Sequence, residues 1–222
     1  MQIRLLIGCA LVALTATVSP GVAHAQFYAY PSFQVPRVSF REYNFAVGDG
    51  PDAGTSRVCQ WREGMNDRMH LQLDAGLADP TRAGGDARFI MGGTAARQMT
   101  TASDDFPLDM LLTFGIGGSF GGGQSFVRVP VGLSVGHRFA FDAPFAVTPY
   151  AHPRLSLDFC SRCSSGGHSD SNLGVDVDLG VDVEISSAIS LRASALLAGS
   201  DLFSRDNGFG VSLAWRPKAL NR

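Results

Sequence analysis

Hydrophobic and polar residues alternate one by one along most of the second half of this chain. From residue 173 to residue 185 every odd position is apolar and every even position is acidic or glycine. The odd positions are Leu173, Val175, Val177, Leu179, Val181, Val183 and Ile185, and the even ones are Gly174, Asp176, Asp178, Gly180, Asp182 and Glu184. Successive side chains of a β-strand point to opposite faces, so this pattern predicts a strand with one apolar and one polar face.

The same period of two marks candidate strands along most of the chain. They lie around residues 43–47, 57–62, 69–77, 89–91, 110–116, 127–135, 147–159, 173–185, 189–197 and 209–215. The segments between them are rich in Gly, Asp, Asn, Ser and Pro, as turns are. No segment has the period of an amphipathic helix, which excludes a parallel α/β domain. The chain is therefore expected to be all-β, with neighbouring strands paired as antiparallel hairpins.

The length of the strands and the charges on their polar faces indicate which face meets water. Strands of soluble proteins run about five or six residues, whereas a tilted membrane strand needs about nine to eleven, which the segment 173–185 exceeds. The polar faces carry both signs of charge, at Arg128, Arg154, Arg192, Asp158, Asp176, Asp178, Asp182 and Glu184. Inside a narrow barrel these residues would pair as a charge network. We therefore predict a closed, antiparallel, up-and-down membrane β-barrel of about ten strands, with eight also possible.

Aromatic residues gather near the ends of the predicted strands, as in the girdles of membrane barrels. They are Phe139, Phe141, Phe145, Phe159 and Trp215. The alternative fold is a water-soluble periplasmic β-sandwich, whose apolar faces would form a core that binds an apolar ligand. Heat-modifiable gel mobility and membrane fractionation distinguish the two folds.

The first 25 residues have the features of a secretory signal peptide. Arg4 precedes an apolar run from Leu5 to Val18, and the run is followed by Ser19-Pro20 and then Ala23-His24-Ala25. At about 14 residues the run is shorter than the roughly 20 of a membrane helix. We predict export and cleavage after Ala25. The expected divisions are a signal peptide at 1–25, a periplasmic N-terminal segment at 26–38, an outer-membrane barrel domain at 39–216 and a C-terminal tail at 217–222.

Charge and cysteine content limit the possible partners. Cleavage removes one arginine and no acidic residue, so the net charge changes from −2 to −3, which gives no case for nucleic-acid binding. In an oxidising compartment Cys160 and Cys163 are expected to form a disulfide that closes a tight loop. Cys59 would then be unpaired. No metal site or cofactor is predicted.

Three prolines interrupt the hydrogen bonding of two predicted strands. Pro149 and Pro153 lie in the segment 147–159, and Pro130 lies in the strand before it. Proline has no N–H to donate to a neighbouring strand. Because residues 149 and 153 have the same parity, both missing donors face the same neighbour, and we predict a bulge or a weak seam there.

With its signal peptide, its alternating strands and its final strand Gly208–Trp215, the chain resembles the small outer-membrane β-barrel proteins of Gram-negative bacteria, a family of porin-like and surface barrel domains. The resemblance covers roughly residues 39–216. It implies contact with outer-membrane lipid and insertion by the barrel-assembly machinery, which reads a final aromatic residue. Here the last aromatic is Trp215, and seven residues follow it. The resemblance implies a structural, adhesive or slow-conducting role, and the leading expectation is a non-enzymatic barrel with a structural or surface-interaction role whose extracellular ligand is unknown.

One segment offers candidate catalytic residues. The sequence from His168 through Ser171 and Asn172 resembles the His-x-Ser-Asn motif of outer-membrane lipid A deacylases, and Glu184 is the candidate acid. The resemblance implies that His168 would activate Ser171 for attack on an acyl chain. In a regular strand, however, residues three apart point to opposite faces. The alternative interpretation is a polar surface loop.

Overall fold

The computed structural model describes residues 32–50, 54–79, 87–141, 144–161, 169–198 and 207–217. No helix among them is long and apolar enough to cross a membrane. The strands are β1 (Arg41–Gly50), β2 (Gly54–Asn66), β3 (Met69–Asp79), β4 (Arg88–Thr100), β5 (Asp109–Gly121), β6 (Gln124–Gly136), β7 (Phe139–Ala140), β8 (Ala146–Ser161), β9 (Asp170–Glu184), β10 (Ile189–Ala198) and β11 (Gly208–Trp215).

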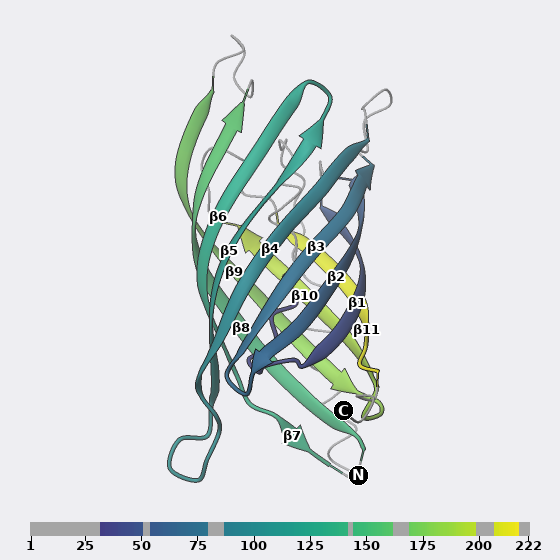
Figure 1. The fold of residues 1–222 in the computed structure, drawn as a ribbon, viewed down its shortest axis with the longest axis vertical. Helices are drawn as coiled ribbons and strands as arrows, with labels where there is room; N and C mark the ends of the chain where they lie inside the picture. Colours follow the sequence, from purple (N-terminus) through teal and green to yellow (C-terminus); the bar gives the residue numbers. More distant parts are fainter. Residues whose placement is uncertain are drawn as a thin grey trace.

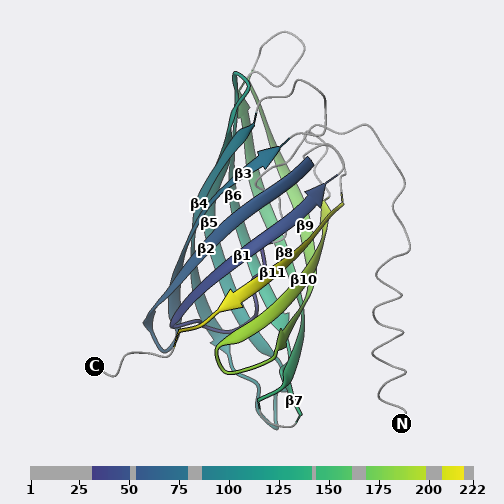
Figure 2. The ribbon, with the colours of Figure 1, turned by 90° about the vertical axis from the view of Figure 1, so that its right-hand side faces the viewer.

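The long strands close into a tilted barrel (Figures 1 and 2). Neighbours in sequence pair antiparallel, β6 pairs with β8, and β11 pairs back onto β1. β7 has two residues and pairs only with β8, so it lies outside the ring of ten long strands. The predicted closed, antiparallel, up-and-down barrel is thus confirmed, and the strand number is ten rather than eight.

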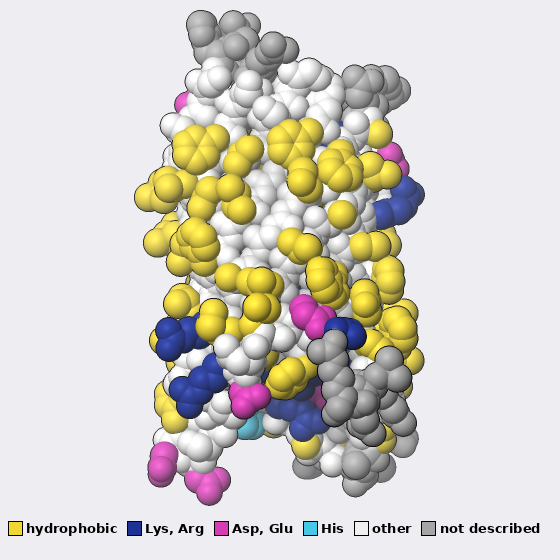
Figure 3. Space-filling view, viewed as in Figure 1, with side chains coloured by type: hydrophobic (Ala, Val, Ile, Leu, Met, Phe, Trp, Pro, Cys, Tyr) yellow, Lys and Arg dark blue, Asp and Glu magenta, His cyan; other side chains and the backbone are white. Residues whose placement is uncertain are grey.

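The two faces of the barrel wall are chemically opposite. Apolar side chains on the outer face are about half exposed, among them Phe45, Leu73, Phe114, Leu155, Leu173 and Leu213. Figure 3 shows such side chains across the wall that faces the viewer, with charged side chains mostly toward its lower end. The charged residues of the strands' inner faces are buried. A water-soluble sandwich has the reverse arrangement, with its apolar faces inside, so the predicted alternative fold is wrong.

The connections between strands divide between the two ends of the barrel. Those of β1–β2, β3–β4, β5–β6, β8–β9 and β10–β11 lie at one end, and those of β2–β3, β4–β5, β6–β8 and β9–β10 lie at the other. The start of β1 and the end of β11 also lie at this second end, where Tyr43 pairs with Trp215, the last residue of β11. The even number of strands places both ends of the barrel domain on one side.

Two strands differ from their predicted bounds for local reasons. The segment 57–62 was predicted as a short strand, but β2 has 13 residues. Its inner face places the apolar Val58 among the polar Ser56, Gln60 and Arg62, which obscures the alternation. The predicted segment 89–91 likewise extends to 13 residues in β4, where glycine and alanine weaken the pattern.

β5 and β6 join through Gly122 and Gly123, whose positive φ angles of 59° and 73° suit a two-residue hairpin turn.

Two of the three prolines, Pro130 and Pro153, lie where strand pairing is interrupted, one on each side of β6, and neither interruption is a bulge. Between β5 and β6 no pair occurs between Phe114↔Val131 and Gly117↔Arg128, the stretch that contains Pro130. Between β6 and β8 none occurs between Gly132↔Arg154 and Val135↔Ala151, the stretch that contains Pro153. The register is the same before and after each gap. β6 is therefore held by two interrupted ladders, which make the weak seam.

We expect the amides of residues 129–134 to exchange with solvent several-fold faster than those of β2 and β3, because local opening follows missing backbone hydrogen bonds. The β2–β3 ladder pairs every residue from Thr55 to Gly64 and serves as the internal control. Hydrogen–deuterium exchange with mass spectrometry on the detergent-folded protein measures both. Equal protection in the two regions would contradict the weak seam.

Candidate functional site in the barrel interior

The interior of the barrel holds fully buried ion pairs. Arg128 of β6 donates from Nε and Nη2 to the two carboxylate oxygens of Asp158, at 2.6 Å each, and from Nη1 to Asp176 at 2.8 Å. None of the three side chains is exposed. The first pair is a two-pronged arginine–carboxylate contact between directly opposite residues of β6 and β8.

A second group is centred on Glu42, near the start of β1. Its carboxylate accepts two hydrogen bonds from Arg192 of β10 and one from Arg62 of β2, at 2.7, 2.7 and 2.6 Å. Arg192 also donates from Nε to Asp182 of β9 at 2.7 Å. These groups come from four strands and pair with one another inside the barrel.

The remaining predicted network residues lie nearby in the same interior. Arg154 approaches Asp178 at 3.5 Å and Asp176 at 3.8 Å. Glu184, at the lower rim, accepts hydrogen bonds from Arg138 and from Arg37. The hydrogen bonds to Glu184 raise the pKa of the Arg138 guanidinium. All eight predicted residues therefore face the interior and take part in ion pairs.

Sequence reasoning missed five members of these groups: Glu42, Arg62, Arg37, Arg138 and Arg216, whose Nε lies 3.8 Å from Glu42. Glu42 and Arg62 were at or beyond the ends of the predicted strands 43–47 and 57–62. Each lies two positions from another polar residue, Glu42 from Asn44 and Arg62 from Gln60, and this spacing puts it on the same, buried face of its strand. That spacing was the signal in the sequence that could have indicated them. Arg37 precedes the barrel in sequence, and nothing local indicates that it enters the interior.

Residues 32–38 lie inside the barrel, and we refer to them as the plug segment. They were expected to belong to a periplasmic segment, 26–38, ahead of the barrel domain. Phe33, Gln34 and Val35 are almost completely buried, at 0, 2 and 4 % exposure. The segment runs from the middle of the interior, where Ser32 meets Asp178, to the rim where β1 begins.

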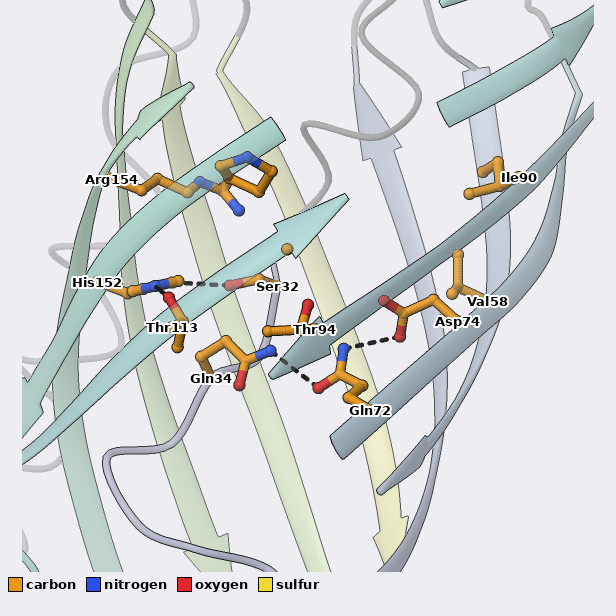
Figure 4. A pocket seen from close by; sticks show the side chains of 12 residues that line it. Ser32, Gln34, Val58, Gln72, Asp74, Ile90, Thr94, Thr113, His152 and Arg154 are labelled. Atoms are coloured by element: carbon orange, nitrogen blue, oxygen red, sulfur yellow. Dashed lines mark hydrogen bonds between the residues drawn. The ribbon is translucent and has the colours of Figure 1, made fainter. Parts of the chain in front are cut away.

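Side-chain hydrogen bonds attach the plug segment to strands around the barrel. Ser32 donates from Oγ to Asp178 at 2.7 Å, and this Oγ lies 2.9 Å from His152 Nδ1. Gln34 donates from Nε2 to Gln72 at 2.8 Å (Figure 4). Figure 4 shows Ser32 and His152 pointing toward each other, with Gln34 and Gln72 doing the same on the other side of the segment.

Charged and backbone groups complete this attachment. Arg37 donates to Glu184 at 2.5 Å and to Asp182 at 3.3 Å. Arg62 donates from Nη2 to the Phe33 carbonyl at 2.9 Å, and Ser134 donates from Oγ to the Gln34 carbonyl. The plug segment belongs to no strand.

Phe33 has a backbone φ angle of 51°, in the left-handed region. A bulky residue there costs about 1–3 kcal/mol of strain. Its side chain is buried in a small apolar cluster with Ala46, Val58, Ala78 and Ile90. Apolar burial and the hydrogen bond from Arg62 therefore hold a strained backbone in place.

A small cavity of about 50 Å³ lies beside the plug segment. Asp74, Thr94, Thr113 and Arg154 are among the residues that line it, together with Ser32 and Gln34 of the plug segment. It has room for a few water molecules and not for a larger ligand. Asp74 accepts a hydrogen bond from Gln72, and it has no ion pair among the described residues.

The predicted hydrolase residues do not come together. Ser171 lies near the start of β9 opposite Phe159, on the outer face, whereas Glu184 is the last residue of the same strand and faces inward. Thirteen positions of a strand separate them by roughly 40 Å. His168 lies outside the described residues. The proposed pairing of Ser171 with Glu184 is therefore wrong.

The remaining predicted sites are placed only in part. Cys160 lies on β8, its predicted partner Cys163 lies outside the described residues, and Cys59 is a free, exposed thiol on β2. His152 faces the interior, where Thr113 Oγ1 lies 2.9 Å from its Nε2. Within the described ranges, no group of three or more His, Cys, Asp or Glu residues could hold a metal ion.

No protein-family model matches the chain, and no curated protein matches it in sequence. Among solved structures it is similar to the β domain of the Bordetella autotransporter BrkA, at a TM-score of 0.47 and 14% identity, over 79% of this chain and 98% of that one. It is also similar to the KdgM porin, at a TM-score of 0.38 and 5% identity, over 78% of this chain and 98% of that one. A de novo designed transmembrane β-barrel is similar at a TM-score of 0.38 and 9% identity, over 82% of this chain and 98% of the designed one.

The strand pairing and burial pattern of this chain define its class. A closed barrel with an apolar outer face and a buried, charged interior is the fold of the outer-membrane β-barrels. The resemblance noted from the sequence is confirmed for the fold.

Proposed function

We propose that the protein is an integral outer-membrane barrel with a structural or surface-interaction role, and that its interior is closed at rest. The observation that carries the proposal is the filled interior: the plug segment and the arginine–carboxylate groups occupy it together. Barrels of about eight strands are filled by their own side chains, and open channels need many more strands. Ten strands leave a modest surplus of space, which the plug segment takes up.

The outer face supports insertion into lipid. Rows of outward-facing apolar residues continue across neighbouring strands, as in Phe114, Val131 and Leu155 of β5, β6 and β8. In this proposal residues 1–25 direct export, the barrel-assembly machinery inserts the chain, and membrane lipid covers these rows. The end with five strand connections faces outward and supplies the surface for interaction.

Two measurements on the wild-type protein test this proposal. We expect the protein to fractionate with outer membranes and to show heat-modifiable gel mobility, because a closed hydrogen-bonded barrel stays folded in detergent until it is heated. In planar lipid bilayers we expect almost no current. Recovery in the soluble periplasmic fraction would contradict membrane insertion, and steady open-channel currents would contradict the closed interior.

A further inference from the structure

The interior of the barrel has two different walls. Most arginine and carboxylate groups lie on the side formed by β8, β9, β10, β1 and β2, and Arg128 reaches this side from β6. Beside the larger Ile90, Leu111, Phe126 and Arg128, the opposite side, formed by β4, β5 and β6, carries eight small inward-facing residues. They are Gly92, Ala96, Gly115, Gly117, Ser119, Gly132, Ser134 and Gly136.

The plug segment takes up space along this small-residue wall. Ser134 donates a hydrogen bond to the Gln34 carbonyl. A Cβ atom added to Gly136 would clash with the Pro149 carbonyl oxygen of β8 and lie 3.0 Å from the ring of Pro36, so glycine accommodates both the neighbouring strand and the segment there. The cavity beside the segment is lined by Thr113, Gly115 and other residues of the same wall.

We propose that residues 32–38 form a displaceable plug, and that its withdrawal opens a passage along the small-residue wall that conducts small cations. The proposal rests on the closed resting state proposed above. It adds an activity that the closed barrel does not have.

The attachment of the plug segment suits withdrawal. Its contacts with the wall are separate hydrogen bonds of side chains and backbone groups to several strands, without a strand ladder. Phe33 would leave its strained left-handed conformation on release. The two buried ion pairs that are joined by two hydrogen bonds each, Arg128 with Asp158 and Arg192 with Glu42, connect barrel strands directly and do not involve the segment.

The charges that remain after withdrawal favour cations. Arg37 would leave Asp182 and Glu184, and Ser32 would leave Asp178. Asp74 already lines the cavity without an ion pair among the described residues. Buried carboxylates outnumber buried arginines in the interior even with the plug in place. A passage lined by an excess of carboxylates attracts cations and repels anions.

The test compares wild-type protein with the double variant Ser32→Ala, Arg37→Ala in planar bilayers under a KCl gradient. Loss of the charge-assisted hydrogen bonds of Arg37 and those of Ser32 should raise the mean current by about tenfold or more, because each such bond shifts a two-state equilibrium by about that factor. The reversal potential should have the sign of potassium selectivity. Arg57→Ala is the matched control, since Arg57 forms an exposed ion pair with Asp79 on the outer face; its current should equal that of the wild type.

A second variant keeps the test decisive if the first fails to fold. Gln34→Ala with Ser134→Ala removes plug contacts without removing a charge, and heat-modifiable mobility verifies folding of each variant. Folded variants with wild-type currents would overturn the plug inference and leave the closed barrel intact. A wild-type current as large as that of the variants would overturn the proposed closed state itself. Anion selectivity in the opened variants would overturn the cation preference.

Discussion

Replacement of Glu42 by glutamine should lower the free energy of unfolding by about 3–5 kcal/mol, the usual effect of breaking one side of a buried ion pair. Glu42 is completely buried and accepts hydrogen bonds from Arg192 and Arg62. The neutral amide keeps the size of the side chain but presents N–H groups to guanidinium groups that also donate. Both arginines would then lose their main counter-charge in a space that water enters poorly.

Urea unfolding in lipid vesicles, followed by the fluorescence of Trp61 and Trp215, measures this effect. Glu63→Gln is the matched control, because Glu63 pairs with Arg41 on the outer face, where ion pairs contribute little. The further substitution Arg62→Met in the Glu42→Gln background should recover part of the lost stability, since Glu42 is the carboxylate that pairs with Arg62 and the substitution removes one unpaired buried charge. An unfolding curve of Glu42→Gln that coincides with that of the control would contradict the central role of this group.

Replacement of Leu155 by arginine should destabilise the inserted barrel by about 2–4 kcal/mol, the effect of a cation near the middle of a membrane barrel's lipid face. Leu155 lies well inside β8, is 54% exposed, and belongs to the apolar row with Val131 and Phe114. A water-facing leucine in the same position would tolerate arginine with almost no change. The substitution therefore distinguishes a lipid-facing surface from a water-facing one.

The same vesicle unfolding assay measures the effect, with Leu155→Met as the control because it keeps an apolar side chain of similar volume. Leu155→Arg should also lower the yield of the heat-modifiable folded form, whereas Leu155→Met should not. Unchanged stability of Leu155→Arg in lipid would show that water covers this part of the wall, which the proposed function does not allow.

Most of the barrel could be predicted from the sequence because strand alternation is a local property. The residues from Leu173 to Glu184 show their two faces whatever their partners are, and the observed strand β9 covers them. Parity also assigned Arg128, Asp176 and the other predicted charges to one face. The weaker predictions came where residues such as Val58 on the inner face of β2 interrupt the contrast between faces.

The partners of these charges could not be predicted because they lie far apart along the chain. Glu42 and Arg192 are 150 residues apart, and Ser32 and Asp178 are 146 apart. Which arginine meets which carboxylate depends on the stagger and curvature of the closed barrel, and no local pattern contains either. The inward glycines of β5 and β6, among them Gly115 and Gly136, leave space inside the barrel, but no local pattern indicates what fills it.

By itself the sequence determined that this chain forms two-faced strands, about ten in number, and that their polar faces hold mixed charge. These properties follow from the geometry of an extended backbone, in which neighbouring side chains alternate. Only the tertiary structure decided which face lies inside, which charges pair and that residues 32–38 fill the interior. Closure brings ten strands around one shared space, and the occupants of that space are chosen by fit and charge across it.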